Sequence, residues 1–261
     1  MTEYSGRGDP ARSLALLWRA KAQEPSSRKG KPELSVDRIV RVAIEVADAE
    51  GLTALSMRRV ADALKVGTMS LYTYVPGKAE LIDVMLDAVY GEPERPEDDT
   101  AGWRARLERV ARQNWALYHR HPWMLQIATT RPVMGPHTIA KYDYELRAVA
   151  GIGLTDIEMD SVLSLVLGHV EGAARRALES AQAEQQTGMS NEQWWGAHAP
   201  LLEKVFDASR YPTAARVGAA AGEAHGGAYE PEHAFEFGLQ RVLDGIEVLI
   251  ERRAAKPGRK K

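Results

Sequence analysis

The residues best suited to chemistry in this sequence lie between Ser56 and Lys78, where two short apolar repeats flank a glycine. In the second repeat, Leu71 and Val75 fall on one side of a helix that turns about 100° per residue. The other side carries hydroxyl, thioether and phenol groups instead of the Glu and Lys that usually fill a solvated helix face. In the major groove of DNA, hydroxyls can meet base edges and apolar groups can meet thymine methyls. The pattern therefore predicts a base-reading helix.

The predicted DNA contacts comprise base-reading residues and one phosphate contact. The base-reading residues are Met69, Ser70, Tyr72 and Thr73 on the outward arc, with Thr68 and Tyr74 at its edges. Lys78 begins the next helix, where a phosphate would meet both its ammonium group and backbone amides. One alternative stays open, in which Tyr74 packs between helices.

Two short helices must position this face. Ser56 is expected to cap the first helix, whose apolar side is formed by Met57, Val60, Ala61 and Leu64. Gly67, which lacks a Cβ, is expected to form the tight turn. Pro76 and Gly77 end the second helix. Two short helices joined by a three- or four-residue turn that contains glycine constitute a helix-turn-helix.

Residues 35–90, and above all Val66–Lys78, resemble the DNA-binding domain of the TetR family of transcriptional regulators. The run Leu71-Tyr72-Thr73-Tyr74-Val75-Pro76-Gly77-Lys78 matches the family's Leu-Tyr-x-Tyr/His-Val-x-x-Lys motif. The resemblance implies an all-helical homodimer that binds double-stranded operator DNA and is released by a small-molecule effector. It also implies that Arg58 contacts DNA. In the alternative, Arg58 is solvated and paired with Asp62 one helical turn away.

Composition limits the other classes of protein. The 261 residues include no cysteine, which excludes disulfides, thiolate zinc sites and cysteine nucleophiles. No apolar run is long enough to cross a membrane and no secretory segment opens the chain, so we expect a cytoplasmic protein. The net charge of −2 shows no basic balance. Any contact with nucleic acid must therefore come from a local surface.

Enzymatic motifs are missing from the sequence. Gly151-x-Gly153 is followed by Asp156 where a dinucleotide-binding fingerprint requires Gly or Ala. His119 and His121 are two residues apart and cannot share a helix face to ligate a metal. We expect no catalytic residue, no metal and no cofactor. Two competing functions remain: a transcriptional activator of the same fold, and an all-helical small-molecule enzyme with an accessory DNA-binding domain.

No segment shows the alternation of a strand, so the sequence predicts an all-α fold. The predicted parts are a flexible N-terminal extension or basic arm, the DNA-binding domain, a ligand-binding and dimerisation domain, and a basic tail, over residues 1–34, 35–90, 100–253 and 254–261. An acidic, proline-rich junction is expected at Gly91–Asp99, and a mobile loop at Tyr211–Tyr229.

Two long apolar helices are expected at residues 155–183 and 231–253. They could be buried within one subunit, or pair with their copies in a second subunit as a four-helix bundle, which the family resemblance favours. In the second case, a stripe on the last helix should lie at or beside the dimer seam. The stripe consists of Leu239, Leu243, Ile246 and Ile250.

The second half of the chain resembles the C-terminal domain of the tetracycline repressors. The matching segments are Arg120-His121-Pro122-Trp123, Thr130-Arg131-Pro132 and Ala234–Leu239. Carried over to this chain, the resemblance implies that the ligand-binding residues are Gln113, Trp115, Trp123, Ile127, Arg131, Tyr142, Leu165 and His169.

The magnesium-binding residues of those repressors are not retained. They have a His three residues before Thr-Arg-Pro and an acidic residue eight positions after a Gly-His pair, where this chain has Ile127 and Ala177. Neither side chain offers the oxygen donors that Mg²⁺ requires. We therefore expect an effector other than a magnesium–tetracycline chelate. We expect it to be apolar and aromatic, because the segments that line the cavity contain Trp115, Trp123, Met124, Ile127 and Tyr142. In the alternative, these side chains only fill the core.

Overall fold

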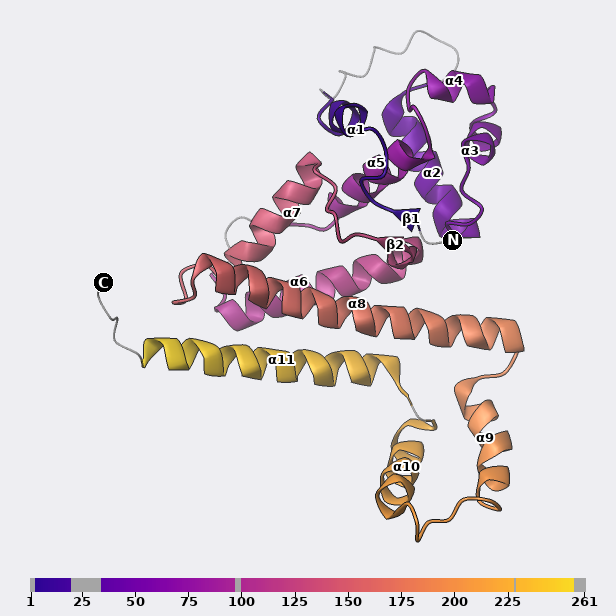
Figure 1. Ribbon diagram of the computed structural model, residues 1–261, viewed down its shortest axis with the longest axis vertical. Coiled ribbons are helices and arrows are strands. Elements are labelled where there is room, and N and C mark those ends of the chain that lie inside the picture. The colour runs from indigo at the N-terminus through magenta and orange to yellow at the C-terminus, as the bar shows by residue number, and fades with distance from the viewer. Residues whose placement is uncertain (1–2, 20–33, 97–99, 228, 256–261) are drawn as a thin grey trace. The chain divides into compact units, whose positions relative to one another are not determined.

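The computed structural model describes residues 3–19, 34–96, 100–227 and 229–255, which are almost entirely helical (Figure 1). The helices are α1 (Pro10–Leu17), α2 (Val36–Glu50), α3 (Met57–Leu64), α4 (Thr68–Tyr72), α5 (Lys78–Tyr90), α6 (Trp103–Arg120), the 3-10 helix η1 (Pro122–Gln126), α7 (Pro136–Arg147), α8 (Asp156–Thr187), α9 (Asn191–Leu202), α10 (Pro212–His225) and α11 (Pro231–Ala254). The strands β1 (Glu3–Tyr4) and β2 (Ile127–Ala128) pair in parallel. The predicted all-α class is confirmed.

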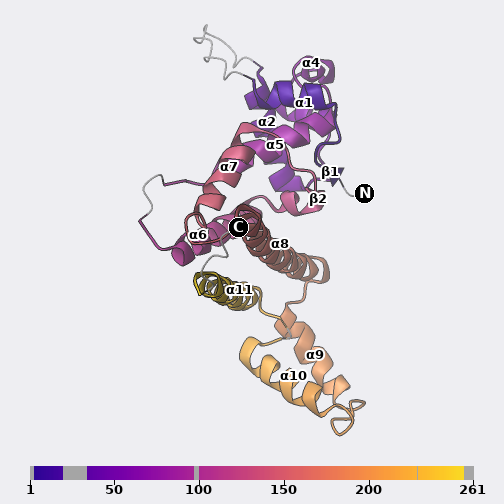
Figure 2. The same cartoon turned by 60° about the vertical axis from the view of Figure 1, so that its left-hand side comes forward.

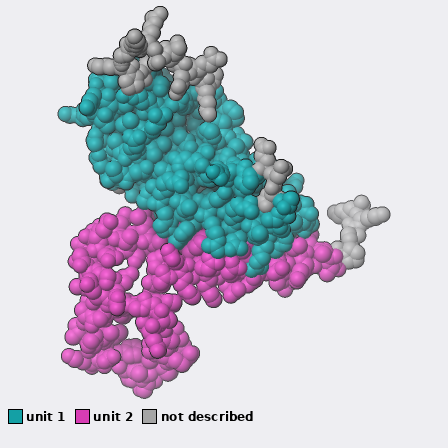
Figure 3. All heavy atoms as spheres, turned by 180° about the vertical axis from the view of Figure 1, so that it is seen from behind, with its two compact units in different colours: residues 1–163 teal, residues 164–261 magenta. Residues whose placement is uncertain are grey.

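The chain divides into two compact units, residues 1–163 and 164–261, coloured teal and magenta in Figure 3. The division falls within α8, not at the acidic junction expected at 91–99. α7 packs against α5, so elements on both sides of that junction belong to the first unit. The predicted domain boundaries stay a prediction. None of the described helices is long and apolar enough to cross a membrane.

The helix-turn-helix forms as its local sequence predicts, with one difference in the turn. The Ser56 hydroxyl accepts a hydrogen bond from the amide of Arg59 at 3.1 Å and caps α3. The left-handed residue of the turn is Lys65, with φ of 58°, whereas Gly67 has an ordinary φ of −69°. The expectation for Gly67 was therefore wrong. Lys65 follows the last residue of α3, where a left-handed conformation commonly ends a helix.

α5 is the central helix of the first unit, and α1, α2 and α7 all pack against it (Figure 2). Its buried residues include three acids, Glu80, Asp83 and Asp87, together with the apolar residues between them. Buried carboxylates require hydrogen-bond donors. Asp87 obtains them from the first turn of α7, where the Thr138 amide and hydroxyl each donate at 2.8 Å. Polar contacts thus hold α7 on α5.

The N-terminal segment differs from the flexible extension predicted for residues 1–34. Residues 3–18 form β1 and α1, and α1 lies against α5. The register of the strands places Glu3 opposite Ile127 and Tyr4 opposite Ala128. Residues 20–33 of the predicted extension lie outside the described residues.

In the second unit, the middle of α8 runs beside α11 (Figures 1 and 2). A Cβ on Gly238 of α11 would lie 2.2 Å from His169 Cε1 of α8, so a larger residue there would displace the imidazole ring. α10 occupies the segment that was expected to be a mobile loop, and that expectation was wrong. Its many alanines favour a helix and Pro212 suits the first helical position.

Candidate nucleic-acid interface and ligand site

The outward face predicted for the second helix of the helix-turn-helix is exposed in the structure. Leu71 and Val75 have no exposed surface, whereas Met69 is 78% exposed. Of the other predicted base-reading residues, Ser70, Tyr72, Thr73 and Tyr74 are exposed and Thr68 is half-buried. The burial of two apolar anchors thus turns a face of hydroxyl, phenol and thioether groups toward solvent. Base contact by these residues stays a prediction.

The two predicted cationic contacts have different surroundings. Arg58 is exposed on α3 and makes no ion pair with Asp62 or with any other described residue. Lys78 is the first residue of α5 and half-buried, and its Nζ lies 2.8 Å from Glu3 Oε1. Arg58 is therefore open to a phosphate, while Lys78 already has an acidic partner.

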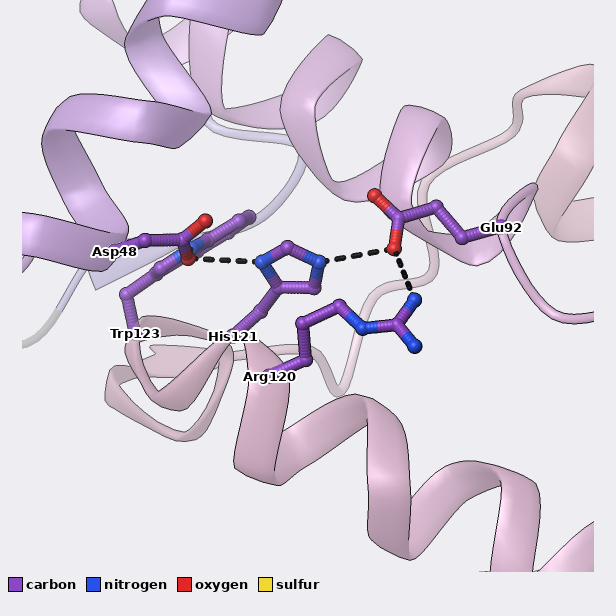
Figure 4. Close-up of polar contacts among 5 residues, drawn as sticks. All are labelled: Asp48, Glu92, Arg120, His121 and Trp123. Atoms are coloured by element: carbon purple, nitrogen blue, oxygen red, sulfur yellow. Dashed lines mark hydrogen bonds and ion pairs between the residues drawn. The ribbon is translucent and has the colours of Figure 1, made fainter.

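A buried histidine connects the helix-turn-helix region to the end of α6 (Figure 4). His121 Nδ1 lies 2.8 Å from Asp48 Oδ1 of α2, and its Nε2 lies 3.0 Å from Glu92 Oε2, just beyond α5. Carboxylate oxygens accept hydrogen bonds, so a ring nitrogen that carries a proton can donate to the carboxylate it faces. Arg120 also contacts Glu92, with Nη1 at 2.9 Å from Oε2. The group joins three segments that are far apart in sequence.

The sequence analysis missed this group. His121 drew attention there only as one of two closely spaced histidines and within a family motif. Its partner Asp48 is 73 residues away, and Glu92 is 29 residues away. No local spacing signals such a contact, because each partner belongs to a different element.

Two predicted ligand-binding residues are buried in the core of the first unit. Trp123 is fully buried and its Nε1 donates a hydrogen bond to Asp48 Oδ1 at 2.7 Å. Ile127 belongs to β2 and to the same apolar cluster as α2, α3 and α5. In this structure both side chains pack in the core, as the alternative in the sequence analysis states. A role in ligand binding stays a prediction for them.

Four further predicted ligand-binding residues belong to the first unit, of which Gln113 and Trp115 lie on α6, Tyr142 on α7 and Arg131 after β2. Gln113 donates from Nε2 to the carbonyl of Glu94 at 2.8 Å. Trp115 packs its ring on His119, with 4.3 Å between the centroids. The Tyr142 hydroxyl donates to Asp160 at 2.8 Å, and this hydrogen bond raises the pKa of Tyr142. The fourth residue, Arg131, is exposed.

Arg131 borders an open hollow of about 580 Å³ between the N-terminal segment and the chain after β2. The lining residues are Tyr4, Ser5, Gly6, Arg7, Ala128, Thr130 and Arg131. Of the eight predicted ligand residues, only Arg131 lines it. This hollow therefore does not bring the predicted ligand-binding residues together.

The last two predicted ligand-binding residues, Leu165 and His169, lie on α8 within the second unit. Leu165 is exposed. His169 stacks on Phe235 and its Nε2 lies 2.9 Å from the Phe235 carbonyl oxygen, which can only accept, so Nε2 donates. Over the described part of the chain, no group of three or more His, Asp or Glu is arranged to hold a metal ion.

Two family models match the sequence. The model described as bacterial regulatory proteins, tetR family, matches residues 39–85, and the model described as tetracyclin repressor-like, C-terminal domain, matches residues 95–250. Together they cover α2 to α5 and most of the chain from α6 to α11. Neither match includes β1 or α1.

The sequence and the structure are also similar to those of known transcriptional regulators. The HTH-type transcriptional repressor DrrR1 of Streptomyces coeruleorubidus is 48% identical over 97% of this chain and 91% of the relative. The tetracycline repressor protein class E of Escherichia coli is 25% identical over 86% of this chain and 96% of its own. Among solved structures, ActR of Streptomyces coelicolor in complex with actinorhodin is 28% identical, with a TM-score of 0.66, over 84% of this chain and 99% of that chain.

Proposed function

Because the chain belongs to the TetR family of transcriptional regulators, we propose that it is a dimeric repressor released from its operator by a small molecule. The observation that carries this proposal is the exposed face of α4, which holds Met69, Ser70, Tyr72 and Thr73 above the buried Leu71 and Val75. Exposed groups of this kind suit base edges and thymine methyls in a major groove. Arg58 lies at the margin of this face, and Lys78 supplies a phosphate contact.

A dimer follows from the geometry of operator recognition. A helix-turn-helix dimer presents two recognition helices to half-sites about one turn of DNA apart, roughly 34–36 Å. The stripe expected at the seam is already covered within one chain, because Leu239, Leu243 and Ile246 are buried. We infer that the seam uses the neighbouring exposed side of α11, where Phe237 is 56% and Val248 is 42% exposed.

The proposed effector is an apolar, aromatic molecule and not a magnesium–tetracycline chelate. Ile127 and Ala177 supply no oxygen donors, which are the ligands that Mg²⁺ requires. The relative ActR has been crystallised with actinorhodin, which supports a small molecule other than tetracycline for a chain of this fold. The proposed contacts remain Gln113, Trp115, Trp123, Ile127, Arg131, Tyr142, Leu165 and His169, which lie on α6, η1, β2, α7 and α8 or, for Arg131, just after β2.

Selection of DNA by the purified full-length chain tests the proposal. Fragments retained from a random duplex library should converge on a two-fold symmetric sequence, and that duplex should shift in a gel. A screen of aromatic molecules should then yield one that releases the duplex and is itself recovered unchanged. Retention of fragments with no common sequence would contradict the proposed function, and turnover of the molecule would favour the enzyme hypothesis.

A further inference from the structure

The N-terminal strap, defined as residues 3–18, lies outside both ranges that the family models match, 39–85 and 95–250. It is nevertheless built into the first unit at both of its ends. Its first residues pair with β2 and its last residues pack on α5 (Figures 1 and 2). The contacts of the strap therefore bear on the helix that begins with Lys78.

Ser5 fixes the first part of the strap to the chain after β2. Its amide donates to the Ala128 carbonyl at 3.2 Å, and its hydroxyl lies 2.5 Å from the carbonyl oxygen of Arg131 and 3.2 Å from that of Ala128. The Ser5 side chain is buried. Because the two strands are only two residues long, this single side chain supplies much of their attachment.

Two acids of α5 hold the rest of the strap. Asp83 accepts hydrogen bonds from the Gly6 amide at 2.9 Å and the Ser13 hydroxyl at 3.1 Å, and Glu80 accepts one from the Asp9 amide at 3.1 Å. A Cβ on Gly8 would lie 2.6 Å from Glu80 Oε1, so the backbone of the strap passes close to this carboxylate. The strap is thus anchored by specific contacts on each side of its turn.

This attachment places an acid on the predicted phosphate contact. Glu3 is the first residue of β1, and its Oε1 lies 2.8 Å from Lys78 Nζ. Both side chains keep about a third of their surface exposed, 28% for Glu3 and 32% for Lys78. A phosphate that approached Lys78 would meet a cation already neutralised and a carboxylate that repels it.

We propose that the N-terminal strap is an autoinhibitory element, in which Glu3 competes with a backbone phosphate of DNA for Lys78. The proposal rests on the proposed function, because it assumes that Lys78 contacts DNA. Withdrawal of Glu3 frees the ammonium group, and loosening of β1 from the chain after β2 is one way to withdraw it. In one state Lys78 contacts a DNA phosphate, and in the other it contacts the carboxylate of Glu3.

The test compares Glu3→Gln with the unaltered full-length chain on the strongest duplex retained from the random library and on an unrelated duplex. Glu3→Gln should bind both duplexes about two- to fivefold more tightly, the range expected for one exposed ion pair. The slope of log affinity against log salt should steepen by about 0.9, the value of one additional phosphate contact. Glu223→Gln removes an exposed acid of α10 and is the matched control, with no change expected.

Two further variants separate competition from a general effect. In a Lys78→Met background, Glu3→Gln should have no effect on affinity or on the salt slope. Ser5→Ala loosens β1 without touching Lys78 and should tighten binding in the same direction as Glu3→Gln. Unchanged or weaker binding by Glu3→Gln would overturn the strap proposal alone, whereas failure of the unaltered chain to bind any duplex would overturn the proposed function.

Discussion

At the scale of single residues, the proposed function depends on how α4 divides its side chains between core and solvent. Leu71 within α4 and Val75, one turn further along the chain, are fully buried and anchor the helix. The residues between them are exposed, as is Ser70 before them. With only five residues, α4 has little helical stability of its own, so these anchors set the orientation of the face.

Replacement of Tyr72 tests whether the exposed face reads bases. Tyr72→Ala should weaken operator binding by about 1–3 kcal/mol and relax preference at one base pair, because one base contact is lost. Tyr211→Ala is a matched control, since Tyr72 is 44% and Tyr211 is 47% exposed. Gel-shift titrations of both variants, with circular dichroism to verify folding, provide the measurement. Equal affinities for a folded Tyr72→Ala variant and the unaltered chain would show that this face does not contact DNA.

The pH dependence of stability can be predicted for Asp83. Burial raises the pKa of Asp83 above its ordinary value, and this outweighs the hydrogen bonds from Gly6 and Ser13 that lower it. In the window between the ordinary and the raised value, the folded state binds more protons than the unfolded state. The free energy of unfolding therefore falls as pH rises through that window. The lower limit of the window is the ordinary pKa of an aspartate, about pH 4.

Asp83→Asn should lack this fall, because the amide does not titrate and can still accept from the Gly6 amide and donate to the Ser13 hydroxyl. Urea unfolding across the window gives the slope for each protein. Asp143→Asn, which alters an exposed acid on α7, should retain the slope of the unaltered chain. If the free energy of unfolding of Asp83→Asn falls with pH as steeply as that of the unaltered chain, Asp83 is not the group responsible.

At the scale of elements, His121 holds α2, the end of α5 and the start of η1 together. Loss of its ring would remove the hydrogen-bonding group that lies between Asp48 and Glu92. Their side chains are 31% and 34% exposed, so water would recover part of the loss. We expect His121→Ala to destabilise the fold by about 1–3 kcal/mol, the usual cost of leaving such groups unpaired.

Urea unfolding of His121→Ala, Asp48→Ala and the double variant measures this contact as a coupling energy. The double variant should be more stable than the sum of the two single losses predicts. Arg120→Met is the control, because its side chain is 61% exposed and its ion pair should contribute about 1 kcal/mol or less. Additive losses would mean that His121 stabilises the fold through its packing and not through Asp48.

Sequence reasoning predicted the elements whose signals are local. Ser56 caps α3, the apolar spacing of Met57, Val60, Ala61 and Leu64 matches the buried side of that helix, and three of the four stripe residues of α11 are buried. It failed where a distant partner decides the structure. The strap was expected to be flexible because nothing near Ser5 indicates its bonds to residues 128 and 131, more than a hundred positions away.

The candidate site was predicted unevenly for the same physical reason. The face of α4 follows from a period of 3.6 residues within one short segment, so the sequence was sufficient to orient it. The ligand-binding residues come from several elements, and the sequence could name them only through a family resemblance. Trp123 shows the difficulty, because the same aromatic side chain suits a ligand cavity and the packed core in which it lies.

At the scale of the whole molecule, the proposed repressor needs two recognition helices at a spacing that matches one turn of DNA. Effector occupancy can reach them within the first unit, since α7 packs on α5 and His121 joins α6 to α2. A ligand shifts the equilibrium between two states only by its different affinities for them. DNA and effector must therefore influence each other equally.

The last prediction is this reciprocity. If a molecule from the aromatic screen weakens operator binding by a coupling of about 1–3 kcal/mol, or roughly 5–150-fold, then the operator must weaken binding of that molecule by the same factor. Calorimetric titrations of the molecule into the protein with and without the operator duplex measure both sides of the linkage. An unrelated duplex serves as the control for ionic effects. Equal affinities of the molecule in the presence and absence of the operator would mean that it binds the DNA-free and the DNA-bound protein equally well, and release of the operator by this molecule would be refuted.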